Sequence, residues 1–130
     1  MSTTQENKPS SILVVDDEAD IVDVFKQALQ QYSFDVTGFT DPLQALEHFR
    51  NPNHYFLVIS DIRMPKMNGF EFVKMVKGIK PEVKVFLMTA FEINEAEFRR
   101  VLASIKIDEF IQKPIPLKKL YWLVCKYVLK

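Results

Sequence analysis

Short apolar runs alternate with longer amphipathic segments along this chain. The run at 11–15 is apolar at every position after its first, which is typical of a strand buried on both faces of a parallel sheet. The runs at 55–60 and 83–88 are also mostly apolar, whereas 34–39 is more mixed and 107–111 is short. The pattern therefore predicts five strands, with 34–39 the more peripheral one.

Apolar residues at helical spacing fill the intervals between these runs. They predict helices over 18–32, 42–50, 69–80, 94–104 and 116–129. The second helix begins at a Thr-Asp-Pro sequence, in which a capping residue precedes a proline of the first turn. On the second and third helices, the positions expected to face inward are Leu43, Leu46, Phe49, Phe72, Val73, Val76 and Ile79.

Strands that alternate with helices predict an α/β fold: a doubly wound parallel sheet with right-handed crossovers. Sheets of this kind place their sites outside the carboxyl ends of the strands. The polar residues at those predicted ends are therefore the candidates for chemistry. They are Asp16, Asp17, Glu18, Ser60, Asp61, Thr89 and Lys113.

Length and composition narrow the class of protein. The 130 residues fit one domain, which we expect over 11–130, after a disordered tail over 1–10. Seventeen basic residues balance seventeen acidic ones, so no net charge indicates a nucleic acid or a membrane surface as partner. No apolar run approaches the roughly 20 residues of a membrane helix. The single cysteine, Cys125, excludes an internal disulfide and suits a reducing cytoplasm.

Three carboxylates are expected to converge at the sheet edge, because Asp16 and Asp17 follow the first strand and Asp61 follows the third. Like charges this close need a cationic partner. Oxygen ligands without cysteine or histidine select a hard cation such as Mg²⁺. One Mg²⁺ together with the Lys113 ammonium would balance the three negative charges.

A metal beside a carboxylate suits two chemistries. A metal-bound water can hydrolyse a substrate, or Asp61 can attack phosphorus to form an acyl phosphate. Phosphoryl transfer mainly requires that the phosphoryl oxygens be positioned and neutralised. The metal, the Lys113 ammonium, and the Thr89 hydroxyl with nearby backbone N–H groups could meet the three oxygens.

Four motifs resemble those of two-component response-regulator receiver domains. They are Ile-Leu-Val-Val-Asp-Asp-Glu at 12–18, Ser-Asp-Ile-Arg-Met-Pro-Lys-Met-Asn-Gly at 60–69, Met-Thr-Ala at 88–90 and Lys-Pro at 113–114. The resemblance covers about residues 11–130. It implies a flavodoxin-like (βα)5 fold with strand order 2-1-3-4-5. The chain would be either a stand-alone receiver of the chemotaxis type or the receiver of a longer regulator.

The resemblance also implies the roles at the site. A sensor histidine kinase or a phosphotransfer protein would phosphorylate Asp61 in a Mg²⁺-dependent reaction, with Mn²⁺ as an alternative metal. Asp17 and Asp61 would ligate the metal directly, Asp16 largely through water, and Arg63 through its backbone carbonyl. The resemblance further implies that Thr89 supplies the switch hydroxyl and that Lys113 contacts the phosphate. It also implies a cis peptide bond before Pro114.

Three further residues are tied to switching and lifetime by the resemblance. Phe110 stands at the position of the aromatic switch residue, where it lacks a phenol hydroxyl. Arg63 and Phe91 stand where the family tunes phosphoryl lifetime, and we hypothesise that Phe91 hinders the attacking water. The face formed by the last two helices and the fifth strand would change on phosphorylation. It would meet a downstream effector or a second copy of the chain.

Other interpretations account for parts of this pattern. A Mg²⁺-dependent aspartyl phosphatase of the haloacid-dehalogenase type would need an acid two residues after its nucleophile, where Arg63 stands. A phosphorylation-independent pseudo-receiver is disfavoured by the complete acidic set. Alone, the Asp16-Asp17-Glu18 acids would fit simple helix capping.

The last helix is apolar nearly all round, so it is either deeply buried or meets a partner. We therefore expect a cytoplasmic signalling module and not an enzyme.

Overall fold

The computed structural model describes residues 10–90 and 94–128, apart from the side chains of 97, 101 and 102. Its five strands form one parallel sheet in the order β2-β1-β3-β4-β5, which confirms the predicted fold. The expected tail lies almost wholly outside the described residues, and Phe91 lies outside them as well. The elements are β1 Ser11–Val15, α2 Ala19–Gln30, β2 Asp35–Phe39, α3 Pro42–Arg50, β3 Tyr55–Asp61, α4 Gly69–Ile79, β4 Lys84–Thr89, α5 Glu95–Ser104, β5 Glu109–Gln112 and α6 Leu117–Val128.

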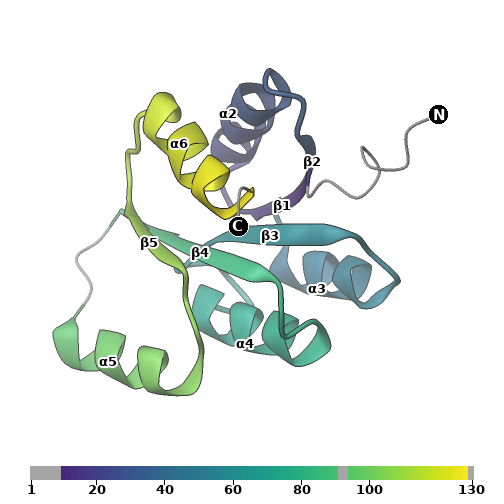
Figure 1. Cartoon of the computed structure of the whole chain (residues 1–130). Coiled ribbons are helices and arrows are strands. Elements are labelled where there is room, and N and C mark those ends of the chain that lie inside the picture. The colour runs from purple at the N-terminus through teal and green to yellow at the C-terminus, as the bar shows by residue number, and fades with distance from the viewer. Residues whose placement is uncertain (1–9, 91–93, 129–130) are drawn as a thin grey trace.

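The sheet separates two hydrophobic cores. Helices α2 and α6 cover one face, and α3, α4 and α5 cover the other (Figure 1). Because side chains alternate along a strand, Leu13 and Val15 enter the core beneath α3 and α4, whereas Ile12 and Val14 enter the core beneath α2 and α6. All four are fully buried, each stabilising the fold by about 2 kcal/mol. The apolar run therefore forms a central strand.

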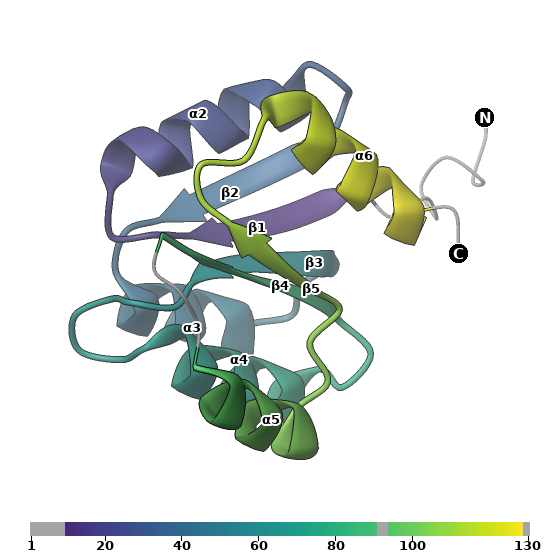
Figure 2. The ribbon, with the colours of Figure 1, turned by 90° about the vertical axis from the view of Figure 1, so that its left-hand side faces the viewer.

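The strand register decides which residues meet at the carboxyl edge. Val15 of β1 pairs with Ser60 of β3, so the next residues, Asp16 and Asp61, lie side by side at the end of the two strands. Asp61 in turn pairs with Met88 of β4, one residue before Thr89. All strands point toward the same edge (Figure 2). This edge therefore gathers the polar residues that follow the apolar runs.

The opposite, amino edge of the sheet is closed by two lysines of the α4 region. Lys77 Nζ donates to the backbone carbonyl of Val83 over 2.5 Å. Lys80 Nζ donates to the backbone carbonyl of Tyr55 over 2.6 Å. These side chains satisfy carbonyl groups that would otherwise require water.

Local sequence explains where the helices around the site begin. Asp41 caps α3, since its Oδ1 accepts a hydrogen bond from Leu43 N over 2.9 Å. Asn68 and Glu71 form a reciprocal capping box at the start of α4.

The prediction that all of the apolar positions named on α3 and α4 face inward is wrong for two of them. Leu43 is 45% exposed and Ile79 is 39% exposed. On α3, Ala45 completes the buried stripe with Leu46 and Phe49, and Leu43 lies about one quadrant away from that stripe. Ile79 is the last residue of α4, so no further turn of the helix packs beside it.

Helix α6, for which the composition left deep burial and a partner contact open, is buried on one side only. Leu120 and Val124 are fully buried against the sheet and Leu123 nearly so. Leu117 and Trp122 are exposed, and Trp122 is the most exposed large apolar residue among those described, at 59%. One side of the helix therefore belongs to the core and the other faces outward.

Candidate functional site

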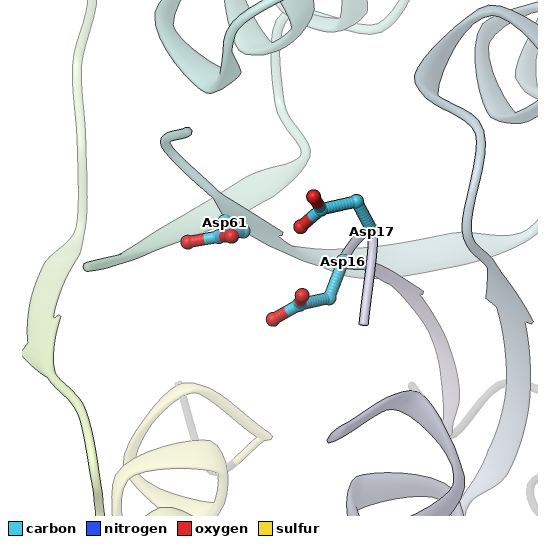
Figure 3. A group of neighbouring side chains, drawn as sticks. All are labelled: Asp16, Asp17 and Asp61. Atoms are coloured by element: carbon cyan, nitrogen blue, oxygen red, sulfur yellow. The ribbon is translucent and has the colours of Figure 1, made fainter. Parts of the chain in front are cut away.

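Three carboxylates from β1 and β3 converge at the carboxyl edge of the sheet, as expected. One oxygen from each of Asp16, Asp17 and Asp61 lies within 4.8 Å of the others. Figure 3 shows the side chains gathered just beyond the ends of the two strands. Asp16 is fully buried and Asp61 nearly so, whereas Asp17 is exposed. Their common position follows directly from the strand register.

Lys113 reaches this cluster from the loop after β5. Its Nζ lies 2.7 Å from Asp16 Oδ2, 3.5 Å from Asp61 Oδ1 and 3.7 Å from Glu18 Oε1. Its backbone N–H donates to the Thr89 carbonyl over 2.8 Å, and the following Lys113–Pro114 bond is cis, as the resemblance implied. The ammonium is therefore held among the carboxylates by its backbone as well as by charge.

One ammonium does not neutralise this site. Burial raises the pKa of the Asp16 carboxyl, although Lys113 and the Glu18 N–H oppose the shift. Burial and the nearby Asp16 charge raise the pKa of Asp61 to about 6, again against the influence of Lys113. Burial alone would lower the pKa of Lys113, but the hydrogen bond and charge of Asp16, with Asp61 and Glu18, leave it raised. The cluster therefore retains unbalanced negative charge.

The donor set fits a hard divalent cation. The cluster offers only carboxylate oxygens, and one of its members faces solvent, where a partly hydrated ion can enter. A double positive charge would remove the excess that Lys113 leaves. Asp16, Asp17 and Asp61 are therefore suited to hold Mg²⁺.

The loop after Asp61 is fixed by backbone contacts. The Ile62 N–H donates to the Met88 carbonyl over 2.9 Å and lies 3.0 Å from Asp61 Oδ1. The Gly69 N–H donates to the Ile62 carbonyl over 2.7 Å. A Cβ at position 69 would overlap the Asp61 carbonyl oxygen, so only glycine permits this close approach.

A small cleft opens over the acidic cluster. It measures about 260 Å³ and is lined by Asp17, Glu18, Asp61, Arg63, Ala90 and Lys113. Thr89 precedes Ala90 and is itself buried. The structure therefore brings together at one edge every predicted site residue that it describes, except Phe110.

The comparisons with known proteins agree with this arrangement. The sequence profile of the response regulator receiver domain matches residues 12–124, most of the chain. This chain belongs to the response-regulator receiver family. Its solved relatives include a CheY-like receiver domain from Methanospirillum hungatei, 25% identical, with a TM-score of 0.83 and coverage of 92% of this chain and 93% of that one. The response regulator TrrA from Thermotoga maritima, solved with Mg²⁺ and BeF, is 33% identical with a TM-score of 0.77, over 91% and 98% of the two chains.

Curated relatives of this receiver domain are longer proteins. The transcriptional regulatory protein ZraR of Klebsiella oxytoca is 35% identical over 109 residues, which are 84% of this chain and 24% of that protein. PgtA of Salmonella typhimurium, a phosphoglycerate transport system transcriptional regulatory protein, is 28% identical over 91% of this chain and 28% of that protein. The receiver domain thus spans about a quarter of the length of these two relatives.

Phe110 of this receiver lies apart from the carboxylates, on β5. It is half-buried and packs against Phe98 of α5, with ring centroids 4.4 Å apart. The sequence pattern did not single out Phe98 as its partner, because both residues simply fit apolar positions of their own elements. Phe91, to which a lifetime role was assigned, lies outside the described residues.

Proposed function

We propose that Asp61 is the phosphoacceptor of this receiver domain. The observation that carries the proposal is the position of Asp61, which is nearly buried, beside two further carboxylates and 3.5 Å from the Lys113 ammonium. A carboxylate in such a place is poorly solvated. The neighbouring carboxylates favour a bound cation, and the Lys113 ammonium favours the oxygens of a phosphoryl group. The donor is a sensor histidine kinase or a phosphotransfer protein.

The reaction transfers one phosphoryl group between two side chains. An Asp61 carboxylate oxygen attacks phosphorus and forms an O–P bond, while the P–N bond of the donor phosphohistidine breaks and its electron pair returns to the imidazole nitrogen. Lys113 meets one phosphoryl oxygen, and the Thr89 hydroxyl with backbone N–H groups meets another. Later hydrolysis of the acyl phosphate returns the carboxylate and inorganic phosphate.

The metal would be held by this chain's own oxygens. We assign Asp17, Asp61 and the Arg63 carbonyl as direct ligands and Asp16 as a ligand largely through water, with Mg²⁺ as the ion and Mn²⁺ as a substitute. When bound, the ion neutralises charge on the phosphoryl oxygens. Asp16 keeps its short contact to Lys113, which suits an outer position.

Switching would link Thr89 to the face formed by α5, β5 and α6. Thr89 and Lys113 are already joined by the backbone hydrogen bond between β4 and the loop after β5. A Thr89 side chain drawn toward the phosphoryl group would make room for Phe110 to turn inward, away from Phe98. The exposed Trp122 lies on α6, and we assign this face to a downstream effector or a second copy of the chain.

A signalling role is supported over an enzymatic one by the residues that line the cleft. Arg63 lines the cleft where a phosphatase would need an acid. No helix in the described ranges is long and apolar enough to span a bilayer. We assign the domain to the cytoplasm, with no direct nucleic-acid or membrane contact.

The lifetime of the phosphoryl group would depend on Arg63 and Phe91. Arg63 lines the cleft beside Asp61, where its guanidinium can meet the phosphoryl group or an acidic neighbour. Phe91 follows Ala90, another residue of the cleft wall, and we assign it to hindering water. Timing the loss of phosphate in Phe91→Ala tests this role, and an unchanged rate would count against it.

A phosphorylation assay with acetyl phosphate tests the main proposal. The wild type should become labelled in the presence of Mg²⁺ and lose labelling on chelation, whereas Asp61→Asn should remain unlabelled. Asp35→Asn is the matched control, because Asp35 is an exposed acid at the amino end of β2, and it should label like the wild type. Equal labelling of Asp61→Asn and wild type would defeat the assignment.

A further inference from the structure

The loop between β3 and α4 has an unusual residue at its tip. Lys66 has a φ of 74°, in the left-handed region. Glycine and asparagine adopt this conformation at low cost, whereas for other residues it costs about 1 kcal/mol or more. Some interaction of the lysine side chain should therefore offset that cost.

An ion pair supplies this interaction. Lys66 Nζ lies 2.9 Å from Asp41 Oδ2, across 25 positions of the chain. The Asp41 side chain is only 20% exposed, and its other oxygen caps α3 through Leu43 N. The hydrogen bond from Lys66 is the main cause of the lowered pKa of Asp41. The tip of the loop is thus tied to a carboxylate that is already fixed on a different helix.

This tie lies between two other anchors of the same loop. The Ile62 N–H is bonded to the Met88 carbonyl at one end, and the Gly69 N–H is bonded to the Ile62 carbonyl at the other. Residues 63–67 lie between them and include Arg63, whose carbonyl is the assigned metal ligand. Within this stretch, the Lys66 side chain forms an ion pair with Asp41, at the start of α3.

We infer that the Lys66–Asp41 pair is a positioning device for the metal site. It holds the loop in the position in which the Arg63 carbonyl can face the carboxylates of Asp17 and Asp61. The inference rests on the proposed function, since it assumes the metal ligands assigned there. Because the pair is partly exposed, its effect should be modest, about a two- to fivefold change in Mg²⁺ affinity.

Simple electrostatics would give a different result from positioning. If charge alone mattered, Lys66→Met would remove a positive charge and strengthen Mg²⁺ binding, whereas Asp41→Asn would remove a negative charge and weaken it. If the pair positions the loop, both variants weaken binding. Asn is as good a helix cap as Asp, so Asp41→Asn retains the start of α3.

The test measures Mg²⁺ binding to the full chain by titration calorimetry, without a phosphoryl donor. We expect Lys66→Met and Asp41→Asn each to bind Mg²⁺ about two- to fivefold more weakly, and the double variant no more weakly than either. High salt should shrink the difference from wild type. Lys74→Met, which removes an exposed lysine of α4, should not weaken binding.

The variant Lys66→Gly distinguishes the effect of the ion pair from the effect of the left-handed backbone at position 66. Glycine relieves the left-handed backbone but has no ammonium, so this variant should also bind Mg²⁺ more weakly even if it unfolds at a higher temperature. Unchanged or tighter Mg²⁺ binding in Lys66→Gly and Lys66→Met would overturn this inference but leave the assigned metal site and phosphoacceptor unaffected. A wild type that binds no Mg²⁺ would overturn the assigned metal site and this inference with it, and labelling of Asp61→Asn would defeat the phosphoacceptor separately.

Discussion

The Lys113 ammonium lies 2.7 Å from Asp16 Oδ2, and Asp16 is fully buried. The lysine side chain is itself only 11% exposed. This ion pair neutralises part of the buried negative charge of the site, so its removal should lower the stability of the fold.

Lys113→Met should therefore destabilise the protein. A buried carboxylate that loses its partner costs about 3 kcal/mol in the free energy of unfolding. Urea denaturation at pH 7.5 without Mg²⁺ measures this cost, with the exposed-lysine variant Lys118→Met as control. The double variant with Asp16→Asn should recover much of the loss; no recovery would mean that Lys113 stabilises the fold by packing alone.

Asp61 should make the stability of the metal-free protein depend on pH. Its pKa is raised from 3.8 to about 6 in the folded state, so folding favours the protonated acid. This stabilisation is complete below about pH 4 and is lost as the pH rises through 6. At pH 7.5, the free energy of unfolding of Asp61→Asn, measured by urea denaturation, should thus exceed that of wild type by on the order of 2 kcal/mol. The difference should be smaller at pH 4.

Mg²⁺ supplies the control for that comparison. Saturating metal should raise the stability of wild type at pH 7.5 and leave Asp61→Asn less affected, because a direct ligand is missing. Equal pH dependence in the two proteins would show that Asp61 is ionised as freely in the folded chain as in the unfolded one.

Two glycines of α4 should respond in opposite ways to alanine. In Gly69→Ala the new Cβ would overlap the Asp61 carbonyl oxygen and stand 2.8 Å from Ile62 Cα, so backbone must move. We expect a loss of about 2 kcal/mol in stability and weaker Mg²⁺ binding. In Gly78→Ala the Cβ meets nothing within 4 Å, and removing a helical glycine should stabilise by about 0.5–1 kcal/mol. Equal effects of both variants, measured by thermal unfolding and calorimetry, would refute the close approach at Gly69.

Labelling and switching should separate at Thr89. Thr89→Val keeps the shape of the side chain but removes the hydroxyl, so acetyl phosphate should still label Asp61, although more slowly. The emission of Trp122, the single tryptophan, on α6, reports the response to a phosphoryl mimic such as beryllium fluoride. We expect a change in wild type and a much smaller one in Thr89→Val. A full-sized change in the variant would exclude the hydroxyl from switching.

Much of the fold was readable from the sequence, because fully buried parallel strands leave a continuous apolar run. The strand at 11–15 and the helix at 42–50 were placed to the residue. Convergence of Asp16, Asp61 and Lys113 was also predictable, since carboxyl ends of parallel strands share an edge.

What the sequence did not reveal depends on tertiary contacts. The exposure of Leu43 and Ile79 is set by where each helix meets its neighbours, which apolar spacing alone does not determine. The Lys66–Asp41 pair joins two residues 25 positions apart, and neither the capping pattern at Asp41 nor the motif around Lys66 predicts that they meet. Phe98 and Phe110 meet only because α5 packs beside β5. The individual roles of the site residues stay predictions until the variants are measured.

The amino edge of the sheet, closed by Lys77 and Lys80, has a practical consequence. Three carboxylates meet at the carboxyl edge, whereas at the amino edge these lysines bond to the backbone of Val83 and Tyr55. A fluorophore or surface tether attached beside that closed edge should leave the phosphorylation chemistry untouched. The domain is therefore suited to immobilisation with its reactive edge facing the solution.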